Sequence, residues 1–174
     1  AHRLRTLPDP TADAVVTAVW EGIQRTHGRP PDQSLPIRPP LLNFVVDACP
    51  TVRDDGSPSL AGLRDRALIL VGFVGALRRS ELCAVNVEDF ADHPSGLTLS
   101  IPHSKTDQYS VGRLAVLPTA GRPSYCPVAA VHAWLSASGI VTGPLFRRVR
   151  KSNSLDVKTT ALNAGSANRL VKNA

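Results

Sequence analysis

Residues 59–84 read SLAGLRDRALILVGFVGALRRSELCA, an apolar segment that ends in two arginines and a glutamate. Ser59 is a favourable helix N-cap. Apolar side chains then follow at helical spacing on one stripe, at Leu63, Ala67, Leu70, Val74 and Leu77. Nearly all the remaining positions of residues 67–77 are apolar too, which predicts a helix buried on all sides. A short second helix is expected over residues 80–84, so Arg78 and Arg79 would lie at the junction of the two helices.

The residues before this segment predict two shorter helices joined by a linker. Asp9, Pro10 and Thr11 are typical of a helix start, with Asp or Thr as the cap, and Gly28 is expected to end that helix. Residues 29–40 contain five prolines, which exclude a continuous helix and favour an extended connection. We therefore expect residues 1–28 and 41–174 to belong to different domains, with a short helix over residues 41–49.

The residues after it predict a small sheet and a further helix. Leu97, Leu99 and Ile101 alternate with polar residues, and residues 114–117 follow after a polar turn at 103–112, which indicates a β-hairpin. Cys126 and Pro127 are expected to open a helix that ends at Gly139, and residues 167–174 a last one. The predicted fold class is α+β, mainly helical, with a small antiparallel sheet beside the helix that delivers Arg78.

Composition excludes several classes of protein. The chain has 174 residues, enough for one domain with attachments, and its longest apolar run, residues 67–77, is too short to cross a membrane. Three cysteines and five histidines show no disulfide or metal-ligand spacing, and no Gly-x-Ser-x-Gly elbow or glycine-rich phosphate loop is present. We expect a cytoplasmic protein without a metal, a cofactor, a membrane partner or a small-molecule substrate.

The charge of the chain is concentrated at its end. The formal net charge is +6, and residues 145–174 hold seven basic groups against one acidic group, so the whole surplus lies in the last thirty residues. This segment is either a solvated basic tail or a surface that binds phosphates. For the second alternative we assign phosphate contacts to four residues of this segment, Arg147, Arg148, Arg150 and Lys151. We assign one more to Arg79, which lies outside it.

Arg78 and Glu81 are the strongest candidates for chemistry, and two interpretations remain open. In the structural one, Arg78 binds carbonyl groups at the end of the buried helix and pairs with Glu81. In the functional one, its planar guanidinium grips two phosphate oxygens while Glu81 orients it. Lys105 in the polar turn is either a solvated lysine or a cation that closes over a ligand. Residues 2–5 match His-x-x-Arg, but so short a pattern at a helix start occurs by chance.

Six motifs in order resemble the catalytic domain of tyrosine recombinases, the phage integrase family. They are LRDRAL at 63–68, GALRRSEL at 75–82, VEDF at 87–90, SKTDQ at 104–108, CPV at 126–128 and GPLF at 143–146. Residues 9–30 are similar to the last helix of the DNA-clamping domain that precedes the catalytic domain in this family. The resemblance covers essentially the whole chain.

The resemblance implies DNA strand breakage and rejoining on double-stranded DNA, without a metal or cofactor, by an enzyme that forms homo-oligomers on DNA. A tyrosine attacks the scissile phosphodiester, forms a 3′-phosphotyrosyl bond and releases a 5′-hydroxyl. Arg78 matches the arginine that stabilises charge on the phosphoryl oxygens. Glu81 is similar to the carboxylate that holds this arginine, and Lys105 to the general acid that protonates the leaving 5′-oxygen.

The family's second arginine, in His-x-x-Arg, and its tyrosine nucleophile come later than the basic segment and are not found in these 174 residues. Tyr109 and Tyr125 do not occupy the nucleophile's place in the order of motifs. We therefore expect a fragment of a recombinase, truncated before these groups, that does not cleave DNA by itself. The alternatives are a non-catalytic DNA-binding module derived from the family, which would regulate a full-length relative, and a basic structural protein that binds nucleic acid without specificity.

Overall fold

A computed structural model describes residues 9–29, 36–101, 112–156 and 159–167 of the chain. The chain divides into two units, Ala1–Pro36 and Ile37–Ala174. Three segments from the sequence analysis lie outside the described residues: the chance His-x-x-Arg match at residues 2–5, the predicted turn with Lys105, and all but the first residue of the last predicted helix. That residues 1–28 form part of a DNA-clamping domain stays a prediction.

The first unit contains one α-helix, α1 (Ala14–His27), preceded by a 3-10 turn over Pro10–Ala12. The α-helix begins later than predicted, because two aspartates cap in succession. Asp9 Oδ1 accepts from the backbone N of Thr11 at 3.0 Å and caps the 3-10 turn. Asp13 Oδ1 accepts from Val15 N at 2.8 Å and caps α1 itself.

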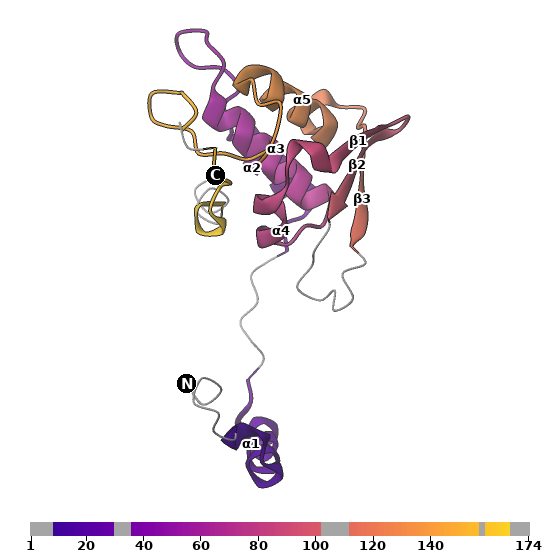
Figure 1. Cartoon of the computed structure of the whole chain (residues 1–174), viewed down its shortest axis with the longest axis vertical. Coiled ribbons are helices and arrows are strands. Elements are labelled where there is room, and N and C mark those ends of the chain that lie inside the picture. Colours follow the sequence, from indigo (N-terminus) through magenta and orange to yellow (C-terminus); the bar gives the residue numbers. More distant parts are fainter. Residues whose placement is uncertain (1–8, 30–35, 102–111, 157–158, 168–174) are drawn as a thin grey trace. The chain divides into compact units, whose positions relative to one another are not determined.

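The second unit is built around α3 (Leu60–Val74), which packs along α5 (Pro127–Ser138), as Figure 1 shows. Buried side chains on several faces of α3 confirm that it is the central helix. Its start is capped twice: Ser59 Oγ accepts from Gly62 N, and Asn153 Oδ1 accepts from Leu60 N at 2.9 Å. Together with the three-stranded antiparallel sheet described below, these helices confirm the predicted α+β fold class.

α2 (Pro39–Asp47) and α4 (Arg79–Ala84) flank the central helix. The prolines at 39 and 40, which we placed in the linker, form the first turn of α2, where a missing N–H costs nothing. Arg66 of α3 fastens α2, because its Nη2 donates to Val46 O at 3.1 Å and to Cys49 O at 3.4 Å.

The sheet has three antiparallel strands in the order β1 (Phe90–His93), β2 (Gly96–Ile101) and β3 (Arg113–Pro118). The predicted hairpin corresponds to β2 and β3. β1 was missed, because its side chains are half-buried or exposed and show no apolar alternation. Ile101 pairs with Arg113, the last pair of this ladder, and residues 102–111 lie outside the described residues.

α3 ends at Val74, three residues before the predicted end of the apolar stripe. The N–H of Leu77 donates to Gly72 O at 3.0 Å and that of Ala76 to Phe73 O at 3.2 Å, which is a Schellman motif. Ala76 has a φ of 47°, the left-handed conformation that this motif requires at its C′ residue. The chain therefore turns sharply just before Arg78.

Replacing Ala76 by glycine should stabilise the protein, because glycine adopts positive φ without a steric penalty. We expect Ala76→Gly to raise the free energy of unfolding by about 1 kcal/mol in a urea titration followed by circular dichroism. Ala61→Gly, a substitution inside the first turn of α3, is the matched control and should lower it by a similar amount. Destabilisation by Ala76→Gly would show that this turn relaxes out of the left-handed region.

Candidate phosphate-binding site

The candidate site lies where α3 ends and α4 begins. Arg78 is the N-cap residue of α4, and Glu81 occupies the third helical position. Glu81 Oε2 accepts from the backbone N of Arg78 at 2.9 Å, and Glu81 Oε1 accepts from Arg78 Nη1 at 2.9 Å. One carboxylate therefore caps the short helix and orients the arginine side chain.

Burial differs sharply between the two partners of this ion pair. The side chain of Glu81 is 3% exposed, whereas that of Arg78 is 48% exposed. A buried carboxylate needs partners that compensate for lost water, and a half-exposed guanidinium still presents N–H groups to a ligand. The pairing agrees with both interpretations of these two residues, because each requires Glu81 to hold Arg78.

Arg113, the first residue of β3, also contacts Glu81. Its Nη2 lies 3.6 Å from Glu81 Oε2 and donates to the carbonyl oxygens of Gly75 at 3.3 Å and Ala76 at 3.1 Å. The carbonyls at the end of α3, which the structural interpretation assigned to Arg78, thus accept from Arg113. Sequence reasoning missed this residue, although strand alternation places it on the same face as the buried Ala115 and Leu117.

Lys105 lies outside the described residues, but Ile101 and Arg113, which flank its segment, lie near Glu81. Arg113, which follows the segment, pairs with Glu81. Ile101, which precedes it, lines a cavity of about 120 Å³ together with Glu81, Asn86 and Ser100. Ile101 and Arg113, the described residues on either side of this segment, therefore lie next to the carboxylate that holds Arg78.

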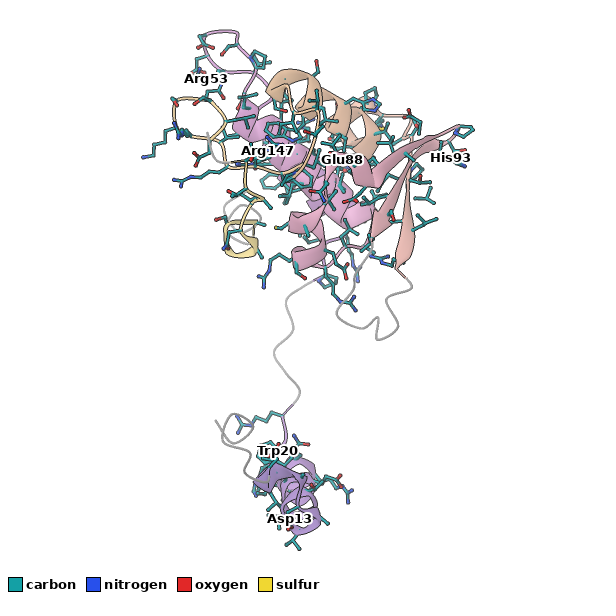
Figure 2. The ribbon with its side chains drawn as sticks, viewed as in Figure 1. Asp13, Trp20, Arg53, Glu88, His93 and Arg147 are labelled. Carbon is teal, nitrogen blue, oxygen red and sulfur yellow. The ribbon has the colours of Figure 1, made fainter. Side chains whose placement is uncertain are left out.

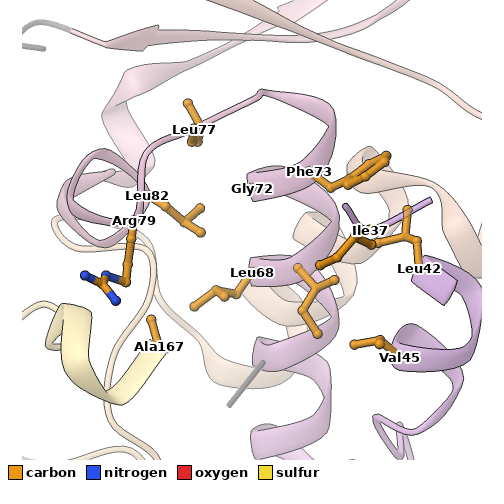
Figure 3. Close-up of a pocket in the computed structure, with 11 residues that line it drawn as sticks. Ile37, Leu42, Val45, Leu68, Gly72, Phe73, Leu77, Arg79, Leu82 and Ala167 are labelled. Carbon is orange, nitrogen blue, oxygen red and sulfur yellow. The ribbon is translucent and has the colours of Figure 1, made fainter. Parts of the chain in front are cut away.

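The predicted phosphate contacts fall into two groups. Arg79 is exposed and lines an apolar pocket of about 300 Å³ between α2, α3 and α4, where it is the charged residue among the described lining groups (Figure 3). An apolar pocket of this kind does not suit a phosphate, so it gives no support to the predicted phosphate contact of Arg79, which stays a prediction.

The basic segment lies at the other end of α3. Asn153 binds the start of the helix, and Arg64 in its second turn donates to the backbone oxygen of Arg147. Since the 15 residues of α3 span about 22 Å, residues 147–151 are not brought together with Arg78. Within this segment Arg147, labelled in Figure 2, donates to the carbonyls of Pro144 and Thr142. Arg150 pairs with Asp156, and Arg148 and Lys151 are exposed.

The charged residues of LRDRAL at 63–68 hold helices together. Arg64 is buried and its Nη2 lies 2.6 Å from Asp65 Oδ1. Burial raises the pKa of Asp65, and the neighbouring Arg64 opposes that shift. The contacts of Arg64 with the carbonyl of Arg147 and of Arg66 with the carbonyls of Ser124 and Val46 fix α3 against its neighbours, which is a structural role.

The tyrosine and the three cysteines among the described residues are unsuited to act as nucleophiles. The hydroxyl of Tyr125 donates to Asp47 Oδ2 at 2.7 Å, and this hydrogen bond raises the pKa of the phenol. Cys49, Cys83 and Cys126 are free and buried, and burial raises the pKa of the first two. Among the residues that the structure describes, no cluster of three or more His, Cys, Asp or Glu side chains could hold a metal ion, and no helix is long and apolar enough to span a membrane.

No protein-family model matches the chain. The chain is similar to a protein described as "Integrase/recombinase xerD homolog" from Selenomonas ruminantium, with 35% identity over 164 residues. These residues are 94% of this chain and 46% of that protein, so the chain spans about half the length of this relative. The similarity supports a relationship with the tyrosine recombinases.

Proposed function

We propose that residues 1–174 are a DNA-binding part of a site-specific tyrosine recombinase, in which Arg78 binds a phosphate of the DNA backbone. The observation that carries the proposal is the half-exposed guanidinium of Arg78 fixed to the buried carboxylate of Glu81. The order of the motifs and the similarity to the integrase/recombinase homologue support it independently. The reaction of the complete enzyme is breakage and rejoining of DNA strands through a phosphotyrosyl intermediate.

The three candidate residues have different roles in this proposal. Arg78 stabilises negative charge on the phosphoryl oxygens, because its N–H groups are oriented before the substrate arrives. Glu81 touches Arg78 but not the phosphate, and acts as a positioning residue. Lys105 donates a proton to the leaving 5′-oxygen, and the positions of the flanking residues Ile101 and Arg113 beside Glu81 support this role. The second arginine and the tyrosine nucleophile belong to parts of the enzyme outside these motifs.

A non-catalytic DNA-binding module is the second candidate. It is favoured by the hydrogen bond of Tyr125 to Asp47. Tyr125 is the one tyrosine among the described residues, and a module that does not cleave DNA needs no tyrosine nucleophile. Both candidates predict DNA binding. They differ in the nucleotide sequence downstream of the codon for Ala174: a reading frame that continues through His-x-x-Arg and a tyrosine supports the recombinase, and one without them supports the module.

Binding of the purified chain to duplex DNA tests the proposal directly. We expect the fluorescence anisotropy of a labelled duplex to rise on addition of protein, with an affinity that falls as salt increases, because Lys and Arg contacts to phosphates release counterions. The logarithm of the affinity should fall linearly with the logarithm of salt concentration, by about 0.9 for each phosphate contacted. Absence of binding at low salt would contradict both candidate functions.

A basic protein that binds nucleic acid without specificity would show the same salt dependence. It would lose as much affinity when exposed Arg148 is replaced by alanine as when Arg78 is, because only total charge would matter. The proposal instead predicts the larger loss for Arg78, whose orientation is fixed by Glu81.

A further inference from the structure

Arg113 is the described residue that joins the sheet to the candidate site. One nitrogen, Nη2, contacts three acceptors: the carbonyl oxygens of Gly75 and Ala76 and the carboxylate of Glu81. Its side chain is 42% exposed, so the guanidinium lies at the edge of the site rather than in the core. None of the sequence motifs that matched the recombinase family includes it.

The first consequence of these contacts concerns the turn that leads into Arg78. The carbonyls of Gly75 and Ala76 come directly after the end of α3, where backbone oxygens lack helical partners and carry partial negative charge. A guanidinium bound there stabilises the left-handed turn at Ala76. Because Arg78 follows two residues later, the contact also fixes where its backbone emerges.

The second consequence concerns charge. Arg78 and Glu81 alone would form a neutral pair, and a neutral pair attracts a phosphate weakly. Arg113 shares the same carboxylate, so the three side chains together carry one net positive charge. The carboxylate thereby has two cationic partners among the described residues.

We propose that Arg113 is a positioning residue for Arg78, acting through Glu81 and the turn at residues 75–76, and that it couples β3 to the phosphate-binding arginine. This inference rests on the proposed function. Arg113 pairs with Ile101 at the end of the β2–β3 ladder, so this coupling acts at the edge of the sheet. Arg113 itself does not contact the phosphate.

A double-mutant cycle distinguishes this role from a purely structural helix cap. The affinity of the full chain for a labelled duplex is measured for wild type, Arg78→Ala, Arg113→Ala and the double variant, at a temperature where circular dichroism shows each to be folded. We expect Arg113→Ala to weaken binding about fivefold when Arg78 is present and to have no further effect when it is absent. Arg113→Lys, which keeps the charge and three donors, should bind within about twofold of wild type.

Three outcomes would overturn the inference. Equal losses in both backgrounds would mean that Arg113 contacts DNA independently, and no loss in either would mean that it only caps α3. Equal binding by Arg113→Lys and Arg113→Ala would show that the positive charge of Arg113 has no role in DNA binding. If Arg113→Ala is unfolded at the assay temperature, Arg113→Gln replaces it in the cycle, since glutamine removes the charge and keeps an N–H donor.

The controls separate this inference from the proposed function. Arg53 is an exposed arginine that pairs with Asp55 in the loop before α3, so it matches Arg113 in type but lies at the opposite end of the helix (Figure 2). Arg53→Ala should leave DNA binding close to wild type. If wild type does not bind DNA, or Arg78→Ala binds as wild type does, the proposed function fails; if only the coupling is missing, this inference alone fails.

Discussion

Arg78→Ala should lower the affinity for duplex DNA about tenfold and reduce the slope of its salt dependence by about 0.9, the value for one phosphate contact. The physical reason is that a charge-assisted hydrogen bond from a preorganised guanidinium is worth about 1.5–3 kcal/mol. Anisotropy titrations of one duplex at four or more salt concentrations measure both quantities. The affinity should fall at every concentration, and most at the lowest.

Arg78→Lys serves as the matched variant for this experiment. Lysine keeps the charge but lacks the planar fork that binds two phosphate oxygens. We expect it to keep most of the salt slope while losing part of the affinity. If the salt dependence of Arg78→Ala has the same slope as that of wild type, Arg78 only pairs with Glu81. That result would support the structural interpretation.

Glu81→Ala should destabilise the protein by about 3 kcal/mol, because it removes the shared partner of two arginines and of a backbone N–H. Without the carboxylate, the guanidinium groups of Arg78 and Arg113 repel each other across the space it occupied. α4 also loses its capping contact, since the N–H of Arg78 no longer has Glu81 to donate to. A urea titration followed by circular dichroism measures the change in the free energy of unfolding.

Two further variants, Glu81→Gln and Asp92→Ala, serve as comparisons for Glu81→Ala. Glutamine keeps an oxygen that accepts from the backbone of Arg78 but loses the charge, so we expect an intermediate loss. Asp92 is an exposed acid on β1 of the same unit, and its replacement should change stability by less than about 0.5 kcal/mol. If Glu81→Ala costs no more than Asp92→Ala, the carboxylate does not hold the arginines in solution.

The central part of the fold could be predicted because strong local signals agree there. The apolar run at residues 67–77, the cap at Ser59 and the Cys126-Pro127 start each act over a few residues, and each element formed where expected. The end of α3 could not be placed, because Leu77 continues the apolar stripe although it belongs to a Schellman motif. β1 was missed for a similar reason, since it is held by pairing with β2 and not by its own side chains.

The candidate site shows the same division between local and distant contacts. Arg78 and Glu81 are three residues apart on one short helix, so their pairing could be read from spacing alone. Arg113 reaches the same carboxylate from 32 positions further along the chain, and only the sheet register brings it there. The basic residues at 147–151 are adjacent in sequence, yet the structure places them beside the start of α3 and away from Arg78.

The geometry gives a physical reason for burying a carboxylate beneath exposed arginines. A surface ion pair holds a guanidinium loosely, because water competes for both partners. Burial of Glu81 removes that competition on one side, so Arg78 is fixed in direction while its outer face stays open to solvent. Such preorganisation is what stabilisation of a phosphoryl transition state requires, since no reorientation is then needed during the reaction.

The most direct test is the crystal structure of the chain bound to a short DNA duplex. The account predicts a single backbone phosphate within about 3 Å of both a guanidinium nitrogen of Arg78 and the Nζ of Lys105, with Glu81 still bound to Arg78. Density that places the two cations on different phosphates, or shows either side chain turned away from the DNA, would contradict it.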